Sequence, residues 1–316
     1  MENQQINNKN MLLKVYSLMI LMLDLITLLF GVIISIIVTF YRTLRPPAMK
    51  NINGEVAMVI GAGRGVGREI ALQLCQLGVK VACVDKNDKM CRATVLQAAR
   101  DSVIVRPYIC DITDKEQVAN TVELIRKDLG EVTMLLHCCG VPSSRSLIQK
   151  PPDIKEAIDV AVVSHFWLLE SVLPGMQRLG KGHIVALSSL AGFSGAASRS
   201  ARIPFSTAQF AIQGFTESLQ AELRQSNSNI IITLIHIYPF IIDSEAANDI
   251  RLRIPSYFGT MPASETARKI LDGVRRNYSE FSVPGYLLYL GHLLRILPKK
   301  ASFMLRDLLD TGVDFG

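Results

Sequence analysis

Four glycines lie close together in the segment Gly61-Ala62-Gly63-Arg64-Gly65-Val66-Gly67. The apolar run AMVI comes shortly before them, and the helical pattern REIALQLCQLG follows them. Glycines allow a tight turn, let the backbone approach a pyrophosphate, and let a helix pack closely on a strand. We therefore predict a dinucleotide site formed by Gly61, Gly63, Arg64, Gly65, Val66 and Gly67. A Rossmann-like loop that binds no nucleotide is the alternative.

Two aspartates end the next two strand-like runs. Asp85 lies 18 residues after Gly67, where a carboxylate can accept hydrogen bonds from both ribose hydroxyls of an adenosine. A carboxylate there would repel a 2′-phosphate, which favours NAD(H), whereas Arg64 in the glycine loop favours NADP(H). Asp111 ends the third run, where it can meet the adenine, cap the next helix, or do both.

Strand-length apolar runs alternate with longer amphipathic stretches after the first fifty residues. This alternation predicts an α/β fold, a Rossmann-like doubly wound parallel sheet with helices on both faces. In such a sheet the ligand site lies at the carboxyl ends of the strands. The predicted strands are EVAMVIGAG, VKVACVDK, IVRPYICD, VTMLLHCCG, GHIVALSS and NIIITLIHIYPF.

Residues 15–41, VYSLMILMLDLITLLFGVIISIIVTFY, are almost continuously apolar. A helix of this length would measure about 40 Å, against a hydrocarbon core of about 30 Å. Asp24 opposes insertion by roughly 3 kcal/mol, which 17 Leu, Ile, Val and Phe residues outweigh at roughly 0.5 kcal/mol each. We predict an uncleaved membrane anchor between a tail (1–14) and a linker (42–52). A cleaved signal peptide and a hairpin or surface-lying helix are the alternatives.

Composition excludes several other classes of protein. The chain has 34 Lys and Arg against 28 Asp and Glu, but no dense basic run with interleaved aromatic residues, so nucleic acid is not an expected partner. Six cysteines follow no framework spacing and are expected to be buried free thiols in a reducing compartment. Without CxxC or histidine clusters, we expect no metal site.

These motifs together resemble the short-chain dehydrogenase/reductase family over roughly residues 53–300. The anchor and the segments SHFWLLESVLPGM, HIYPFIIDS and RILPKKASFMLRDLL are similar to its membrane- or lipid-droplet-associated branch. That branch contains 17-beta-hydroxysteroid dehydrogenases 11 and 13 and the epidermal retinol dehydrogenases. The resemblance implies a cytosol-facing, NAD-dependent enzyme that acts on secondary alcohols of steroids or on retinol.

The family's catalytic positions are where this chain departs from the pattern. In the family a Tyr transfers the proton, a Lys one turn later lowers the Tyr pKa, a Ser polarises the substrate oxygen, and an Asn supports a proton-relaying water. The matching positions hold Phe205, Gln209, Ser189 and Ala161. Ser189 also lies 16 residues before Phe205, three more than the family's usual 13.

The fourth strand and its neighbours depart from the family as well. The family's Asn-Asn-Ala-Gly is His137-Cys138-Cys139-Gly140 here, with Gly140 the position expected to contact cofactor. Ionisable side chains that could replace the Tyr are Tyr238 and His137, although His137 is also explained as a core residue in the space of the lost Asn. A phenyl ring cannot transfer a proton, and a neutral amide cannot lower a phenol pKa.

Three hypotheses follow for the function. The first, which we prefer, is a pseudoenzyme: a dead or crippled dehydrogenase that still binds NAD(H). The second is an active oxidoreductase with an unusual acid or base. The third is a structural interaction protein of a membrane or lipid droplet that binds no nucleotide.

The remaining expectations concern the surroundings of the domain (53–285). The segment 286–316 is amphipathic and is expected either to lie on a bilayer or to pack on the domain. The family implies a possible homodimer and an endoplasmic reticulum or lipid-droplet location, with the domain in the cytosol. Specificity would reside in EAANDIRLRIPSYFGTMPASE, whose conformation the sequence does not give.

Overall fold

The structure is a computed structural model of the 316-residue chain. It describes residues 2–99, 104–140, 154–189, 192, 203–237, 241–242 and 261–309. The chain divides into two units, Met1–Met49 and Lys50–Gly316, which are described separately below.

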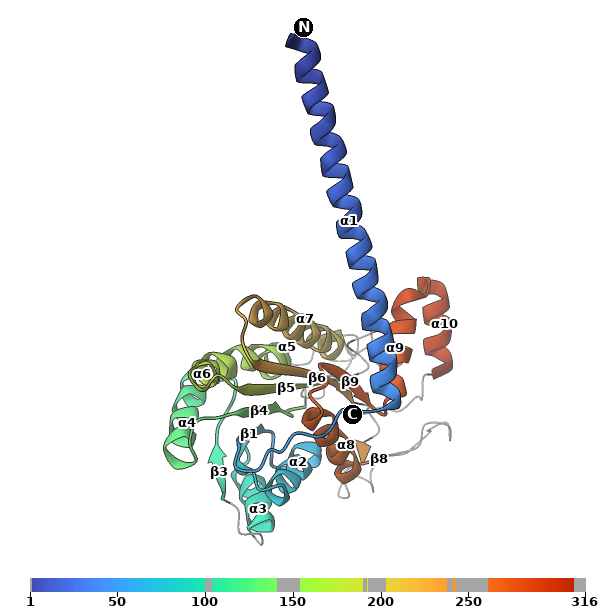
Figure 1. Ribbon diagram of the computed structural model, residues 1–316. Helices are drawn as coiled ribbons and strands as arrows, with labels where there is room; N and C mark the ends of the chain where they lie inside the picture. The colour runs from blue at the N-terminus through green and yellow to red at the C-terminus, as the bar shows by residue number, and fades with distance from the viewer. Residues whose placement is uncertain are drawn as a thin grey trace. The chain divides into compact units, whose positions relative to one another are not determined.

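The first unit is a single helix, α1 (Glu2–Leu44) (Figure 1). Its portion Leu13–Leu44 is long and apolar enough to cross a bilayer and contains Asp24. Thr27 and Thr39 donate their hydroxyl protons to backbone carbonyls four residues earlier, at 2.9 and 2.8 Å. Polar side chains bonded back to their own helix suit an apolar surrounding, because no water is needed to satisfy them.

The second unit is built on a seven-stranded sheet whose strands are all parallel. The strand order is β3-β2-β1-β4-β5-β6-β9, which confirms the predicted doubly wound sheet. The order reverses between β1 and β4, and there the ligand site of such folds is found. The strands are β1 (Val56–Ile60), β2 (Lys80–Asp85), β3 (Val105–Ile109), β4 (Met134–His137), β5 (Gly182–Ser189), β6 (Ile230–Ile237) and β9 (Glu280–Val283).

The strand β9 was not among the predicted strands, and neither was a small pair, β7 (Ile241–Ile242) with β8 (Met261–Pro262). In β9 only four residues, EFSV, pair with β6, and although they alternate between polar and apolar types, the run is very short. Short runs of this kind give little periodicity to read.

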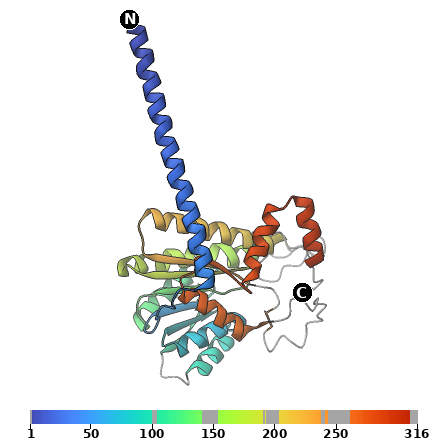
Figure 2. The ribbon, with the colours of Figure 1, turned by 45° about the vertical axis from the view of Figure 1, so that its right-hand side comes forward.

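Helices cover both faces of the sheet (Figure 2). Neighbouring residues of one strand point to opposite faces, so Val59 belongs to the apolar cluster that includes α2 and α8, and Met58 to the cluster that includes α4, α6 and α7. The helices are α2 (Gly65–Gln76), α3 (Asp88–Ala98), α4 (Lys115–Asp128), α5 (Ile154–Ile158), α6 (Ser164–Leu179), α7 (Ile203–Gln225), α8 (Ala263–Arg275), α9 (Tyr286–Ile296) and α10 (Lys299–Leu309). A π-helical turn, Asp159–Val163, joins α5 to α6.

The cysteines agree with the prediction of unpaired thiols. Cys75, Cys83, Cys91 and Cys110 are buried, and the adjacent Cys138 and Cys139 are half-buried, all as free thiols. Burial raises the pKa of Cys139 to about 12, with a further contribution from the charge of Asp85, so this thiol stays protonated near neutral pH.

Candidate functional site

The glycine loop leaves β1 and enters α2 as the sequence predicts. Gly61 and Gly65 have φ values of +78° and +57°, in the region that favours glycine. A Cβ atom on Gly67 would overlap the carbonyl oxygen of Gly61, so the helix could not approach the strand with any larger residue there. Backbone geometry thus explains these three glycines without reference to a ligand.

Asp85, at the end of β2, is tied directly to this loop. Its Oδ2 accepts a hydrogen bond from the Gly63 backbone N–H at 2.8 Å, and its Oδ1 accepts one from the Asn87 N–H at 2.9 Å. A Cβ on Gly63 would lie 2.7 Å from Oδ2, so glycine is needed for this approach. The carboxylate is held beside the loop, where it is expected to meet a ribose.

Asp111 does not cap the following helix, so that interpretation was wrong. Its Oδ1 accepts hydrogen bonds from the Thr113 backbone N–H at 3.0 Å and the Thr113 hydroxyl at 2.8 Å. The cap of α4 is Asp114, whose Oδ1 accepts from the N–H groups of Glu116 and Gln117. Asp111 therefore shapes the turn after β3 and remains a candidate for contact with an adenine.

The carboxyl end of β4 closes the other side of the loop. A Cβ on Gly61 would lie 3.1 Å from both the backbone nitrogen and the Sγ of Cys139, so the two segments are in close contact. An added Cβ on Gly140, one residue further, would meet nothing within 4 Å. Gly61, Gly63 and Gly67 thus form a tightly packed turn, called the glycine cradle below, at the start of α2, where a dinucleotide fold binds pyrophosphate.

The residues at the family's catalytic positions occupy the expected elements. Ser189 is the last residue of β5 and pairs in register with Ile237, while Phe205 and Gln209 lie on α7, one turn apart. Ala161 is buried in the π-helical turn before α6. The turn keeps the irregular backbone that is frequent at functional sites, although alanine offers no side-chain polar group.

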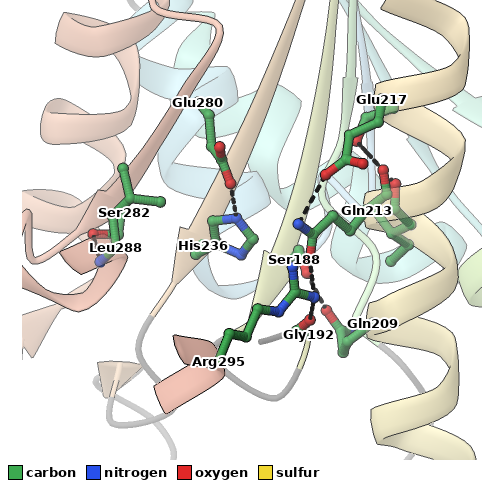
Figure 3. Close-up of polar contacts among 12 residues, drawn as sticks. Ser188, Gly192, Gln209, Gln213, Glu217, His236, Glu280, Ser282, Leu288 and Arg295 are labelled. Carbon is green, nitrogen blue, oxygen red and sulfur yellow. Dashed lines mark hydrogen bonds and ion pairs between the residues drawn. The ribbon is translucent and has the colours of Figure 1, made fainter. Parts of the chain in front are cut away.

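Gln209 is hydrogen-bonded to Ser188 rather than to the neighbouring Ser189. The Ser188 hydroxyl donates to Oε1 of Gln209 at 3.0 Å, and the two residues are only 2% and 5% exposed (Figure 3). Gly192 packs against the same pair, because a Cβ there would lie 3.0 Å from both the Ser188 Oγ and the Gln209 carbonyl oxygen. The position of the family's lysine is therefore filled by a neutral, buried amide whose oxygen already has a partner.

A row of buried polar side chains crosses three neighbouring strands beside this contact, and sequence analysis missed it. Ser188 pairs in register with His236, which pairs with Ser282 of β9. His236 Nε2 is 2.8 Å from Oε1 of Glu280 (Figure 3). This hydrogen bond lowers the pKa of Glu280 against the opposing effect of burial. Only the unpredicted strand β9 brings Glu280 to the histidine, so no local pattern could have found the pair.

His137 lies on the opposite side of β5, in β4, and is a core residue. Its ring is stacked on His165 of α6, with centroids 3.9 Å apart, and its Nε2 is 2.8 Å from the Ser164 hydroxyl. Burial, aided by His165, holds the pKa of His137 well below its usual range, so the ring is neutral near pH 7. These contacts favour the structural interpretation of His137 over an acid–base role.

Two predicted features lie outside the described residues. They are Tyr238, the other ionisable candidate, and most of the specificity segment, residues 245–260.

Comparison with known proteins agrees with this geometry. Residues 55–254 match the family model for short chain dehydrogenase. The chain is 30% identical to mouse epidermal retinol dehydrogenase 2, covering 82% of this chain and 84% of that protein. It is 25% identical to human 17-beta-hydroxysteroid dehydrogenase 13, covering 90% and 93%, and 27% identical to rat estradiol 17-beta-dehydrogenase 11, covering 93% and 96%.

Solved structures show the same fold. A short chain dehydrogenase/reductase from Burkholderia phymatum in complex with NAD has a TM-score of 0.68 at 20% identity, covering 78% of this chain and 94% of that one. NAD+-bound xylitol dehydrogenase has a TM-score of 0.64 at 22% identity, covering 74% and 99%. The glycine cradle, the strand order and these matches agree: the chain belongs to the short-chain dehydrogenase/reductase family, in the branch of the 17-beta-hydroxysteroid and epidermal retinol dehydrogenases.

Proposed function

We propose that this protein is a membrane-associated short-chain dehydrogenase/reductase of the lipid-alcohol type that binds NAD(H) but has lost most or all of its turnover. The observation that carries the proposal is the contact between Ser188 and Gln209 at 3.0 Å. At the position where the family has a cation, this chain has an uncharged amide whose oxygen is engaged by a buried hydroxyl.

The chemical consequence concerns the proton of the substrate alcohol. A bound nicotinamide cofactor would supply the hydride acceptor, but the alcohol proton still needs a base on the protein. Phe205 has no ionisable group, and Gln209 cannot lower the pKa of one. Loss of general acid–base catalysis alone slows a reaction by roughly 10²- to 10⁴-fold.

The proposed cofactor is NAD(H), with NADP(H) less favoured. Asp85 is held beside the cradle by two backbone N–H groups, at 2.8 and 2.9 Å, so its charge stays where a 2′-phosphate would lie. Arg64, an exposed residue of the loop, remains the opposing influence.

The proposed location is the cytosolic face of the endoplasmic reticulum membrane, a lipid droplet, or both. Support comes from the apolar helix α1 and from α9, where four exposed residues recur at helical spacing. They are Tyr286, Tyr289, Leu293 and Ile296, which are 46%, 65%, 46% and 81% exposed. The relatives named above act, by their names, on retinol, estradiol and hydroxysteroids, so a lipid alcohol is the proposed ligand class.

A homodimer through α6 and α7 is also proposed. Phe166 and Phe210 are 49% and 39% exposed on these helices, which makes an apolar contact between two copies favourable. Light scattering of the detergent-purified protein would give twice the chain mass for a dimer, and a single chain mass would exclude it.

Titration of the full-length protein in detergent micelles with NADH tests the proposal. Binding to the folded state alone raises its stability by RT ln(1 + [L]/Kd), so NADH at about 100 times its Kd adds about 2.7 kcal/mol. We expect a rising melting temperature with NADH and a smaller rise with NADPH. A melting temperature indifferent to millimolar NADH would instead support the class of structural interaction proteins.

A second candidate function is an active oxidoreductase with an unusual base, and one observation favours it. His236 is buried and in register with Ser188, and its Nε2 lies 2.8 Å from the carboxylate of the half-buried Glu280. A carboxylate that orients an imidazole is the usual arrangement of a general base. If the protein oxidises a lipid alcohol, His236→Gln should abolish that turnover; unchanged turnover would exclude the pair.

A further inference from the structure

The side chain of Arg295 joins three separate elements near the candidate site. Its Nη2 donates to the Gly192 carbonyl oxygen at 3.1 Å and to Oε1 of Gln213 at 3.0 Å (Figure 3). Its guanidinium also lies over the Phe210 ring, 5.4 Å from the centroid. One residue of α9 is thus bonded to the segment after β5 and to α7.

The bond from Arg295 holds Gly192 beside the contact between Ser188 and Gln209. Gly192 is the third residue after Ser189, and it packs directly on Ser188 and on the backbone of Gln209. The span between Ser189 and Phe205 is the one that exceeds the family's usual length.

Gln213, which accepts the hydrogen bond from Arg295 on α7, is itself held in place. Gln213 is 5% exposed, and its Nε2 donates to Oε1 of Glu217 at 2.9 Å, which leaves its oxygen directed at Arg295. Both bonds are donated by Nη2 of Arg295, whose two hydrogens can serve the two acceptors.

The other end of α9 is held independently. The Ser282 hydroxyl donates to the carbonyl oxygens of Pro284 and Gly285 at 2.8 and 3.0 Å, and it accepts from the Leu288 N–H at 2.8 Å. Leu287 and Leu294 are buried. Loss of Arg295 should therefore free the contact with the site without unfolding the helix.

We propose that Arg295 is a positioning residue, which holds Gly192 beside Ser188 and Gln209 and makes the C-terminal helix α9 part of the nicotinamide side of the site. This inference rests on the proposed NAD(H) binding. The adenosine and pyrophosphate of the cofactor would be held at β1 and β2, which lie on the far side of β4 from β5. Arg295 should therefore affect one half of the cofactor only.

The test compares Arg295→Met, Arg295→Lys and a matched control, Arg268→Met, in the full chain in detergent micelles. Arg268 is an exposed arginine of α8 whose Nη1 is 3.7 Å from Asp272. Affinities are measured for NADH and for ADP-ribose, which lacks the nicotinamide. Hydrogen–deuterium exchange is measured for peptides that cover residues 182–189 and 203–217.

We expect Arg295→Met to lower the affinity for NADH about tenfold, or about 1.4 kcal/mol, and to leave the affinity for ADP-ribose unchanged. Exchange should rise in both peptides, Arg295→Lys should recover part of each effect, and Arg268→Met should change nothing. Equal loss of both ligands, or unchanged exchange in Arg295→Met, would overturn the inference. If the wild type binds neither ligand, the proposed function fails, while the exchange data still decide the role of Arg295. Should Arg295→Met fail to fold, Arg295→Gln takes its place, because its shorter, neutral side chain cannot reach both acceptors; full NADH affinity and protection in that variant would contradict a bridging role.

Discussion

The Ser188 hydroxyl and the Gln209 side-chain oxygen are 3.0 Å apart, and both residues are almost fully buried. A buried hydroxyl that lost this acceptor would cost about 1–3 kcal/mol. The Gln209 amide therefore contributes to the stability of the fold. A lysine at position 209 could donate to the Ser188 oxygen, which recovers part of this cost, although the hydroxyl hydrogen loses its acceptor.

Restoring the lost pair should restore proton transfer. We expect Phe205→Tyr with Gln209→Lys to raise NADH formation from NAD+ and a lipid alcohol by roughly 10²- to 10⁴-fold over the wild type. The measurement is absorbance at the NADH band with retinol, estradiol and long-chain alcohols.

Single changes are the controls for this experiment. Phe205→Tyr alone should raise the rate of NADH formation far less than the double change, because residues that act as a unit do not contribute additively. A double variant that binds NADH normally and remains inert would show that more than the acid–base pair has been lost, with Ala161 the next position to restore.

The glycine cradle should be intolerant of the smallest side chain. Gly67→Ala would force its Cβ onto the Gly61 carbonyl oxygen, and we expect a loss of about 1–3 kcal/mol in the free energy of unfolding together with the loss of NADH binding. Gly214→Ala is the matched control: on α7, with nothing within 4 Å of its Cβ, it should stabilise by about 0.5–1 kcal/mol. Denaturant melts with and without NADH separate the two effects, and a Gly67→Ala variant of normal stability would contradict the packing.

Asp85 should decide between the two cofactors. Asp85→Ser removes the charge that opposes a 2′-phosphate and leaves Arg64 to attract it, so we expect NADH affinity to fall and NADPH affinity to rise, each by about tenfold. Isothermal titration of both cofactors checks this. Asp111→Ser, which alters the next turn without facing the ribose, should leave the ratio of the two affinities unchanged. A ratio unaffected by Asp85→Ser would remove this carboxylate from the site.

Stability should fall on mild acidification because of the buried histidines. Burial lowers the pKa of His165 to about 4, from 6.5 when exposed, with a small opposing effect of the nearby Ala161 carbonyl. Below pH 6.5 His165 therefore binds a proton in the unfolded chain, whereas in the folded chain it binds one only near pH 4. Between these pH values the free energy of unfolding decreases by roughly 3 kcal/mol because of His165 alone. His137 is shifted in the same direction and adds to the loss.

Denaturant unfolding at a series of pH values measures this slope. His165→Phe, which keeps the stacked ring without a titrating nitrogen, should flatten the curve between pH 6.5 and 4. An unchanged slope in this variant would show that the ring is not buried in neutral form.

The sequence predicted the features that depend on local patterns. Glycine spacing after an apolar run located the cradle, and a carboxylate at the end of the next run located Asp85, because parallel strands place successive ends along one edge. The sequence prediction that Asp111 caps the helix after β3 was wrong. Asp114 directly precedes α4 and caps it, whereas Asp111 lies three residues earlier and bonds to Thr113 in the turn after β3.

Contacts between distant segments were beyond sequence analysis. Strand alternation alone does not show whether Ser188 or Ser189 faces α7, because the strand ends at that point. The pair His236 and Glu280 depends on a strand of four residues, which is too short to be predicted from its alternation, and Arg295 reaches a glycine 103 residues away.

The central claim is most directly tested by NADH formation in a sample already shown to bind NADH. Full-length protein in detergent micelles is incubated with NAD+ and with retinol, estradiol and long-chain alcohols, at neutral and at alkaline pH. We predict no rate above that of the buffer, because neither Phe205 nor Gln209 can take the alcohol proton. A robust rate that Ser189→Ala abolishes would contradict this and would identify the protein as an active dehydrogenase with a different base.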